Sequence, residues 1–279
     1  MPLRLLVLDA YAPEGREALR NAGASEAGAL YERMLRRLAP DASVARAYPA
    51  DPDPALPDAE GLRAYDGVCW TGSSLTIHQE DDPRVRRQID FARTVYEAGV
   101  PSFGSCWAAQ LAVVAAGGRC ARNPRGREFG VSRRIALSRS GRVHPVFAGK
   151  PDVFDAFTSH CDEVVILGRS ATLLASNDWS RVQAVDVACG RGRFWAVQYH
   201  PEYDLHEVAS LCRLRADELV AEGRFATRAD ADRYVFDLEA LHREPGRLDL
   251  RRELEIDEAL LDEDLRTREV RNWLASLGA

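Results

Sequence analysis

A sharp turn between a buried strand and a helix constrains this chain more than any other feature. The short apolar run 100–103 predicts the end of a buried strand, and Gly104 interrupts it. Residues 107–116 are rich in Ala, Leu, Val and Gln and therefore predict a helix. Cys106 then lies at the N-terminus of that helix, where the helix dipole and the free N–H groups favour a thiolate.

A second set of reactive residues follows far downstream. Residues 194–199 predict a strand, His200 falls at its carboxyl end, and Glu202 comes two residues later. A lone cysteine at a turn is most often a small buried hydrophobic residue. A nucleophilic cysteine, however, needs an imidazole to hold its thiolate, and the imidazole needs a carboxylate to fix its tautomer. Cys106, His200 and Glu202 together therefore predict a catalytic triad.

Strands and helices alternate through the first half of the chain. Predicted strands cover residues 3–8, 44–48 and 67–71, and predicted helices cover 26–38 and 84–98, with Asp82 as N-cap of the second helix. This alternation predicts an α/β fold with a three-layer, doubly wound, mostly parallel sheet. Gly72, Cys106 and His200 would then share the edge formed by the carboxyl ends of the strands.

After residue 118 the pattern changes to short alternating runs, which predict a strand-rich second half. These runs cover residues 131–137, 153–157, 164–167, 172–175, 182–187 and 194–199. We expect one domain over 1–204 and a highly charged helical C-terminal extension over 205–279, with helices at 204–222, 230–241, 257–265 and 267–277. A cap on the sheet is favoured over a partner-docking or dimerisation element, and burial of Trp273 would support the cap.

Composition narrows the class of protein. The net charge of −6 argues against broad attraction to nucleic acid, and no apolar run is long enough to span a bilayer. The apolar N-terminus 1–9 predicts a first strand rather than a signal peptide, because it is short and Asp9 interrupts it. Six scattered cysteines form no C-x-x-C pair and no zinc-spaced cluster, which favours a reduced cytoplasmic protein without a metal.

Two motifs carry a resemblance to a known family. Gly-x-Cys-aromatic-x-x-Gln at 104–110, followed by Gln-aromatic-His-Pro-Glu at 198–202, resembles the class I glutamine amidotransferase domain. The resemblance runs in order from about Leu3 to Glu202 and implies a flavodoxin-like fold. It implies that Cys106 is the nucleophile, that His200 is the acid and base, and that Glu202 orients His200.

The resemblance also implies which groups bind the substrate. The oxyanion hole would use a backbone N–H of Gly72 or Ser73 together with that of Trp107. Gln110 would contact the substrate through its side chain.

A later segment at 158–164 resembles the part of the family in which the backbone near a histidine contacts glutamine. Ser159 and His160 are therefore expected at the substrate. The side chains of His160 and Asp162 are expected to be mainly structural, as a loop histidine paired with a carboxylate. Ser74 and Ala108 depart from residues that are usual in the family, and the Ala108 methyl lies in a crowded turn.

The implied reaction is hydrolysis of the glutamine side-chain amide to glutamate and ammonia through a γ-glutamyl thioester, without a cofactor. The chain resembles the glutaminase part of GMP synthase but lacks a Ser-Gly-Gly-x-Asp-Ser loop and a G-x-x-x-x-G-K-[ST] loop. A separate synthetase subunit would then accept the ammonia. Two alternatives stay open: a stand-alone γ-glutamyl hydrolase or peptidase, and a catalytically silent regulatory or binding module.

Overall fold

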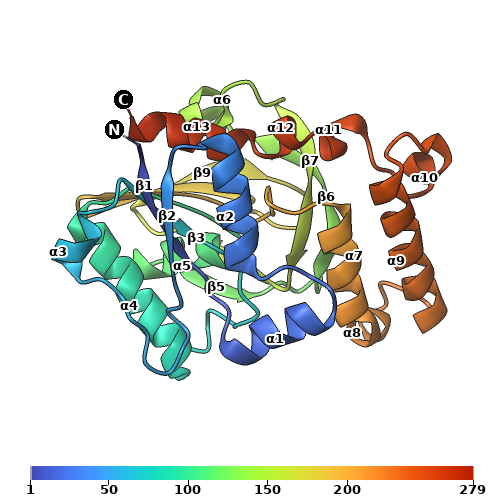
Figure 1. The fold of residues 1–279 in the computed structure, drawn as a ribbon, viewed down its shortest axis with the longest axis horizontal. Coiled ribbons are helices and arrows are strands. Elements are labelled where there is room, and N and C mark those ends of the chain that lie inside the picture. The colour runs from blue at the N-terminus through green and yellow to red at the C-terminus, as the bar shows by residue number, and fades with distance from the viewer. Residues whose placement is uncertain (1, 279) are drawn as a thin grey trace.

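The computed structural model describes residues 2–278, and a nine-stranded sheet forms its centre (Figure 1). The strand order is β2-β1-β3-β4-β11-β10-β9-β6-β7. The first five strands in this order run parallel: β2 Ser43–Ala47, β1 Arg4–Leu8, β3 Gly67–Trp70, β4 Ser102–Ser105 and β11 Gly192–Val197. The predicted mostly parallel α/β core is therefore confirmed.

The other strands pair antiparallel and come from the second half of the chain. They are β10 Ala184–Cys189, β9 Ala171–Ser176, β6 Glu128–Leu137 and β7 Val153–His160. A separate two-stranded sheet joins β5 Arg119–Arg122 to β8 Asp162–Ile166. The strand-rich second half was predicted, but β5 was not, because its four residues show no apolar alternation.

Both faces of the parallel strands are buried, which explains the unbroken apolar run in β1. Leu5 and Val7 enter the core on one face, whereas Leu6 and Leu8 enter the core on the other. On the first face lie α2 Ala27–Leu38 and α13 Arg268–Leu277. On the second face lie α4 Pro83–Ala98 and α5 Trp107–Ala115. Helices on both faces make the three layers that the sequence predicts.

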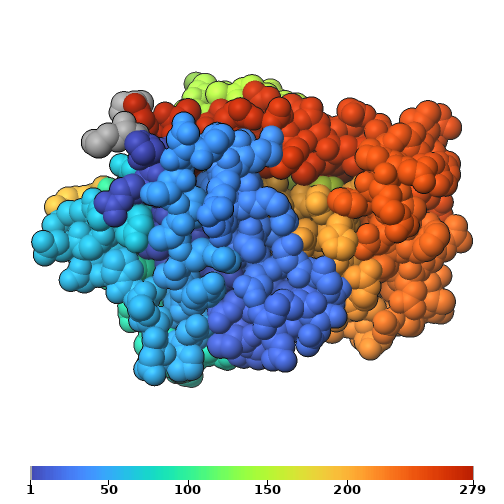
Figure 2. Space-filling model, viewed as in Figure 1, coloured from blue at the N-terminus to red at the C-terminus, as the bar shows by residue number. Residues whose placement is uncertain are grey.

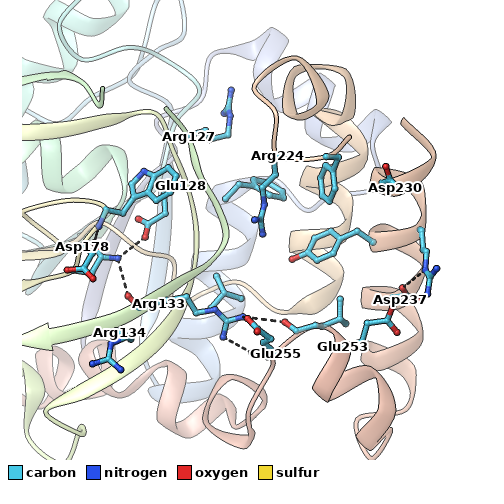
Figure 3. Close-up of a pocket in the computed structure, with 18 residues that line it drawn as sticks. Arg127, Glu128, Arg133, Arg134, Asp178, Arg224, Asp230, Asp237, Glu253 and Glu255 are labelled. Carbon is cyan, nitrogen blue, oxygen red and sulfur yellow. Dashed lines mark hydrogen bonds and ion pairs between the residues drawn. The ribbon is translucent and has the colours of Figure 1, made fainter. Parts of the chain in front are cut away.

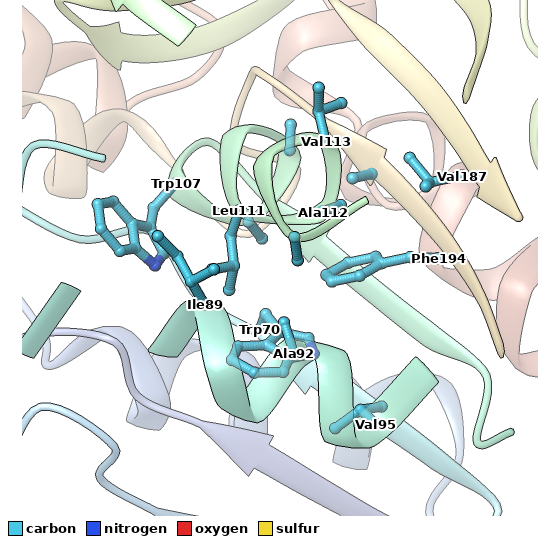
Figure 4. Close-up of a cluster of buried hydrophobic side chains, with 14 of the residues drawn as sticks. Trp70, Ile89, Ala92, Val95, Trp107, Leu111, Ala112, Val113, Val187 and Phe194 are labelled. Carbon is cyan, nitrogen blue, oxygen red and sulfur yellow. The ribbon is translucent and has the colours of Figure 1, made fainter. Parts of the chain in front are cut away.

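The core between α4, α5 and the sheet contains large aromatic side chains (Figure 4). Trp70 stacks on Phe194 with ring centroids 6.0 Å apart, and Trp107 is 1% exposed. The predicted start of α4 is confirmed, since the Asp82 side chain accepts a hydrogen bond from the Arg84 N–H. Most side chains of α5 are buried in this core. The packing holds α5 with its N-terminus at the carboxyl edge of the sheet.

Short helices in the connections were not predicted, since they have few apolar residues. They are α1 Pro13–Asn21, α3 Ala59–Leu62, α6 Arg139–Val143 and the 3₁₀ turn Pro145–Phe147. No helix within residues 2–278 has both the length and the hydropathy that a membrane span requires.

The C-terminal extension is helical, as predicted, but more interrupted. It contains α7 Leu205–Leu214, α8 Ala216–Ala221, α9 Arg228–Arg243, α10 Leu248–Glu253, α11 Glu258–Leu261, α12 Glu263–Arg266 and α13. The single helix expected over 204–222 breaks at Arg215, and the one over 257–265 is two short helices. Figure 2 shows the extension covering one end of the molecule (orange) and then running along its upper edge (red).

Trp273 decides between the two expectations for the end of the extension. Its side chain is 1% exposed and its ring lies 5.9 Å from that of Phe103 in β4. A Cβ on Gly67 would come within 2.8 Å of the Trp273 ring, so the glycine makes room for the indole. The last helix is thus a buried cap on the sheet, and its apolar face is not left open for a partner.

Candidate active site

Cys106 occupies the turn between β4 and α5 with a backbone conformation that non-glycine residues rarely adopt. Its φ is 56° and its ψ is −102°, and its N–H donates to the Val197 carbonyl at 2.8 Å. Such strain persists only where neighbouring structure imposes it, and it is typical of a nucleophile held above a sheet. The position of Cys106 at the N-terminus of a helix is as the sequence predicts.

We expected Gly104 to end the strand, but β4 continues through it to Ser105. The glycine instead makes room for the helix that follows. A Cβ on Gly104 would lie 2.4 Å from the Ala108 Cβ and 2.6 Å from the Trp70 carbonyl oxygen. The methyl of Ala108, which departs from the family's usual glycine, therefore points at the sheet and is fully buried there.

His200 follows β11 and lies beside Cys106. Its backbone N–H donates to the Phe157 carbonyl at 2.8 Å. A Cβ on Gly72 would come within 2.9 Å of His200 Cε1 and 3.7 Å of the Cys106 Cβ. Both side chains therefore meet at one small-residue position at the end of β3, where only a glycine fits. The three strand ends that the sequence assigns to one edge do converge.

A buried carboxylate orients the imidazole. His200 Nδ1 lies 2.7 Å from Glu202 Oε1, and the two side chains are 2% and 3% exposed. The Ser105 hydroxyl donates to the same Glu202 oxygen at 2.9 Å, and the Tyr31 hydroxyl donates to Ser105 Oγ at 2.7 Å. With Nδ1 engaged by Glu202, the other ring nitrogen, Nε2, is the one available to the thiol. Sequence reasoning missed Ser105 and Tyr31, which carry no motif of their own.

Electrostatics favour a charged imidazole at this position. Burial alone would lower the pKa of His200, but the Glu202 carboxylate and the Cys106 sulfur outweigh it and raise the pKa to about 9. The ring also stacks flat on Tyr203, with centroids 3.9 Å apart and planes inclined by 3°. The imidazolium is thus held in one orientation against Cys106.

The three backbone N–H groups at the predicted oxyanion positions have no acceptor within residues 2–278. They belong to Gly72, to Ser73 and to Trp107, the first residue of α5. The Ser73 hydroxyl donates to the Ala10 carbonyl and accepts from the Leu75 N–H, which holds the loop after Gly72 in place. Unpaired donors fixed beside a nucleophile can bind a developing oxyanion.

A cavity of about 350 Å³ opens at Cys106. Five of the residues that the sequence assigns to the substrate or the oxyanion line it together with the cysteine: Ser73, Trp107, Gln110, Ser159 and His160. The carbonyl of Ser159 accepts from the Cys106 thiol at 3.7 Å. Six of the nine predicted site residues therefore line one cavity, whereas Gly72, His200 and Glu202 lie outside its lining, and the His200 ring approaches Cys106 beside Gly72.

The contacts of Gln110 and His160 are partly different from the expectation. Gln110 Nε2 donates to the Asp162 carbonyl at 3.2 Å and to Gln198 at 3.3 Å. His160, which ends a strand and is not in a loop, pairs with the carboxylate of Glu128 at 2.8 Å and reaches Asp162 only through its backbone carbonyl. The expected carboxylate partner was wrong, because the pairing of β6 with β7 brings Glu128 opposite His160.

A larger cavity of about 640 Å³ lies between β6 and the helices α9 and α10 of the extension (Figure 3). Arginines and carboxylates dominate its wall, Arg127 is shared with the first cavity, and its lining includes no cysteine and no histidine. All six cysteines are free thiols, and no cluster within the described chain offers three metal-ligating side chains. The cavity at Cys106 is therefore the candidate active site.

Comparisons with known proteins agree with this geometry. The family model "Glutamine amidotransferase class-I" matches residues 65–212. A gamma-glutamyl-L-1-hydroxyisopropylamide hydrolase from a Pseudomonas species is 35% identical over 228 residues, which cover 81% of this chain and 76% of the relative. A glutamine-hydrolysing GMP synthase from Streptomyces avermitilis is 32% identical over 63% of this chain, but the match spans only 31% of the synthase.

Solved structures show the same fold at low sequence identity. A glutamine amidotransferase from Thermotoga maritima superposes with a TM-score of 0.66 at 17% identity, covering 99% of this chain and 98% of its own. A glutamine amidotransferase from Methylobacillus flagellatus gives a TM-score of 0.54 at 18% identity, covering 97% of this chain and 94% of its own.

Proposed function

Because this chain belongs to the class I glutamine amidotransferase family, we propose that it hydrolyses a γ-glutamyl amide through a thioester on Cys106. The family membership makes the chain a glutamine amidotransferase-type amide hydrolase. The observation that carries the proposal is the approach of the His200 ring to Cys106 beside Gly72, at a cavity that Cys106, Ser73 and Trp107 line.

The first half-reaction forms the thioester. The Cys106 thiolate attacks the γ-carbonyl carbon of the substrate, and the new C–S bond leaves a negative charge on the carbonyl oxygen. The N–H groups of Trp107 and of Ser73 or Gly72 hold that oxygen. His200 then gives its proton to the amide nitrogen, the C–N bond breaks, and the amine leaves.

The second half-reaction regenerates the thiolate. Neutral His200 takes one proton from a water molecule, which attacks the thioester carbon; the C–S bond then breaks to expel the Cys106 thiolate, and the γ-carboxylic acid that forms loses its proton to solvent. Glu202 holds the Nδ1 side of the ring throughout, so the same Nε2 atom serves as acid and then as base. No step uses a cofactor.

The substrate class that we favour is the γ-glutamyl amide of a small amine. The relative named for such an amide aligns with 81% of this chain, so the match reaches beyond residue 204 into the extension. The cavity also continues past Cys106 to Arg127 and Glu218, which gives room to a leaving group larger than ammonia. The six free thiols fit a reducing compartment such as the cytoplasm.

Glutamine itself is the second candidate substrate, supported by the match to GMP synthases. The chain spans about a third of those relatives, and in that case the ammonia would pass to a separate synthetase subunit. The two candidates share the thioester and differ only in the amine that leaves.

Steady-state hydrolysis by the purified chain tests the proposal. We expect faster turnover of γ-glutamyl amides of small amines than of glutamine, and no turnover with Cys106→Ala. A Glu202→Gln variant should keep a reduced rate, because Glu202 orients and does not react. Comparable turnover by Cys106→Ala would refute the mechanism. Failure of a glutamine-like chloroketone to alkylate Cys106 would favour a catalytically silent module.

A further inference from the structure

Arg215 brings a charge from the C-terminal extension into the cavity at Cys106. It lies at the break between α7 and α8, and neither glycine nor proline accounts for that break. Helix α7 packs beside α1, and α8 follows α7 directly (Figure 1). Ala216 and Leu219 of α8 are buried, which fixes the turn, and the half-buried Arg215 side chain lines the cavity.

The guanidinium of Arg215 contacts neutral groups only. Its Nη1 donates to the Ser159 hydroxyl at 3.2 Å, and the phenol of Tyr11 lies close to it. Within the described part of the chain, no carboxylate lies within ion-pair distance of it. A partly desolvated cation without a counter-charge is unfavourable unless a ligand supplies that charge.

The other arginines of this cavity are already paired. Arg127 bonds Glu218 at 2.8 Å and Glu222 at 2.9 Å, and Arg122 lies 3.9 Å from Glu222. Glu218, the carboxylate of the cavity that is nearest in sequence to Arg215, is thus engaged by Arg127. Among the described residues, Arg215 is thus the one arginine of this cavity without a carboxylate within ion-pair distance, and the charge of Glu218 reaches it only over a longer distance.

Ser159 links this cation to the nucleophile. Its carbonyl accepts from the Cys106 thiol at 3.7 Å, while its hydroxyl accepts from Arg215 at 3.2 Å. One residue therefore separates the sulfur from the guanidinium. In a γ-glutamyl group, two methylenes and the α-carbon separate the reacting carbonyl from the α-carboxylate, so a carbonyl at Cys106 leaves the α-carboxylate within the cavity that Arg215 also lines.

We propose that Arg215 binds the α-carboxylate of the γ-glutamyl substrate, so that the C-terminal extension completes the substrate site. This inference rests on the proposed function and names the group that the site recognises. A guanidinium and a carboxylate form paired, charge-assisted hydrogen bonds, which fix both the position and the direction of the bound group. Arg215 is thus a specificity-determining residue that holds the γ-carbonyl over Cys106.

Three p-nitroanilides with the same leaving group test the proposal. The γ-glutamyl anilide has both α-substituents, the glutaryl anilide keeps the carboxylate alone, and the 4-aminobutyryl anilide keeps the amine alone. We expect Arg215→Met to lower kcat/KM for the two carboxylate-bearing anilides by about 10- to 100-fold, the range for a hydrogen bond between charged groups. The 4-aminobutyryl anilide, already slow with the native chain, should be hydrolysed at an unchanged rate.

Arg122→Gln is the matched control, because it removes a cation of the same cavity whose partner, Glu222, stays paired with Arg127. It should leave the ratio of kcat/KM between γ-glutamyl and 4-aminobutyryl anilides at the native value. Alkylation of Cys106 by the neutral reagent iodoacetamide, at a native rate in Arg215→Met, shows that the variant keeps its site. An equal loss for all three anilides in Arg215→Met would overturn the proposal and make Arg215 merely structural. Absence of all anilide hydrolysis by the native chain would instead defeat the proposed function.

Discussion

The ring of Tyr203 lies flat against the imidazole of His200, with centroids 3.9 Å apart and planes 3° from parallel. Glu202, which directly precedes Tyr203 in the turn after β11, holds Nδ1 of the same imidazole. The ring is therefore restrained both at its edge and on its face, which restricts rotation toward any direction other than Cys106.

Replacing Tyr203 by Leu should lower kcat/KM about tenfold or more, because small misplacements of a reacting group are costly. Tyr203→Phe keeps the stacked ring and should retain most of the activity. Hydrolysis of a γ-glutamyl anilide by the two variants measures the difference. Equal losses in both variants would show that the hydroxyl of Tyr203, and not the stack, matters.

The rate should depend on pH through His200. Its pKa is raised to about 9, so the imidazolium that donates a proton to the leaving amine disappears as the pH rises through that value. We expect kcat/KM to fall on the alkaline side near pH 9. Glu202→Gln removes the carboxylate that raises this pKa, so the fall should move to lower pH. If the alkaline fall of kcat/KM stayed at the same pH in Glu202→Gln, or moved to higher pH, the assignment of this fall to His200 would be contradicted.

The free energy of unfolding should also depend on pH through His200. Its raised pKa means that folding favours the protonated ring. This stabilisation is complete below the unfolded pKa of about 6.5 and is lost as the pH rises through about 9. In Cys106→Ala the sulfur no longer supports the charge, so the His200 pKa should be lower than in the native chain. Titration of the His200 ring by NMR measures this pKa. An unchanged pKa in Cys106→Ala would show that the sulfur does not stabilise the charged imidazole.

Gly104 should tolerate no side chain. Its added methyl would meet Ala108 at 2.4 Å and the Trp70 carbonyl oxygen at 2.6 Å, so we expect Gly104→Ala to destabilise by about 1–3 kcal/mol or more. Ala108→Gly removes one of these clashes and should restore part of the loss in the double variant. Urea denaturation of the single and double variants gives the coupling energy. Strict additivity would mean that the two methyls do not meet.

Trp273 should matter to the whole fold. It is 1% exposed against Gly67 and Phe103, so Trp273→Ala should cost about 3–5 kcal/mol of unfolding free energy. Phe236→Ala, at a 65% exposed site on α9, is the control and should change stability by about 0.5 kcal/mol or less. Truncation after residue 204, our predicted domain boundary, would uncover the same face. A soluble, native-like truncated chain would contradict a structural role for the extension.

The fold class and the position of Cys106 could be predicted because their signals are local. Apolar runs such as 3–8 and 67–71 predict buried strands. The motif at 104–110 is likewise contained in one short, continuous segment. His200 and Glu202 were within reach for the same reason, since both follow directly after a predicted strand. Parallel strands collect their carboxyl ends at one edge, so the meeting of these residues with Cys106 follows from the fold class itself.

The rest of the site depends on contacts between segments that are distant in sequence. Glu128 replaces Asp162 as the carboxylate beside His160 only because β6 pairs with β7. The break at Arg215 has no helix-breaking residue, and its side chain turns toward Ser159 because α8 is packed against the body of the protein. Hydrophobic periodicity reports which face of an element is buried, but not what it is buried against. The sequence by itself thus determined the strands of the central sheet, the turn and the three reactive residues, while tertiary structure alone decided which polar partners surround them.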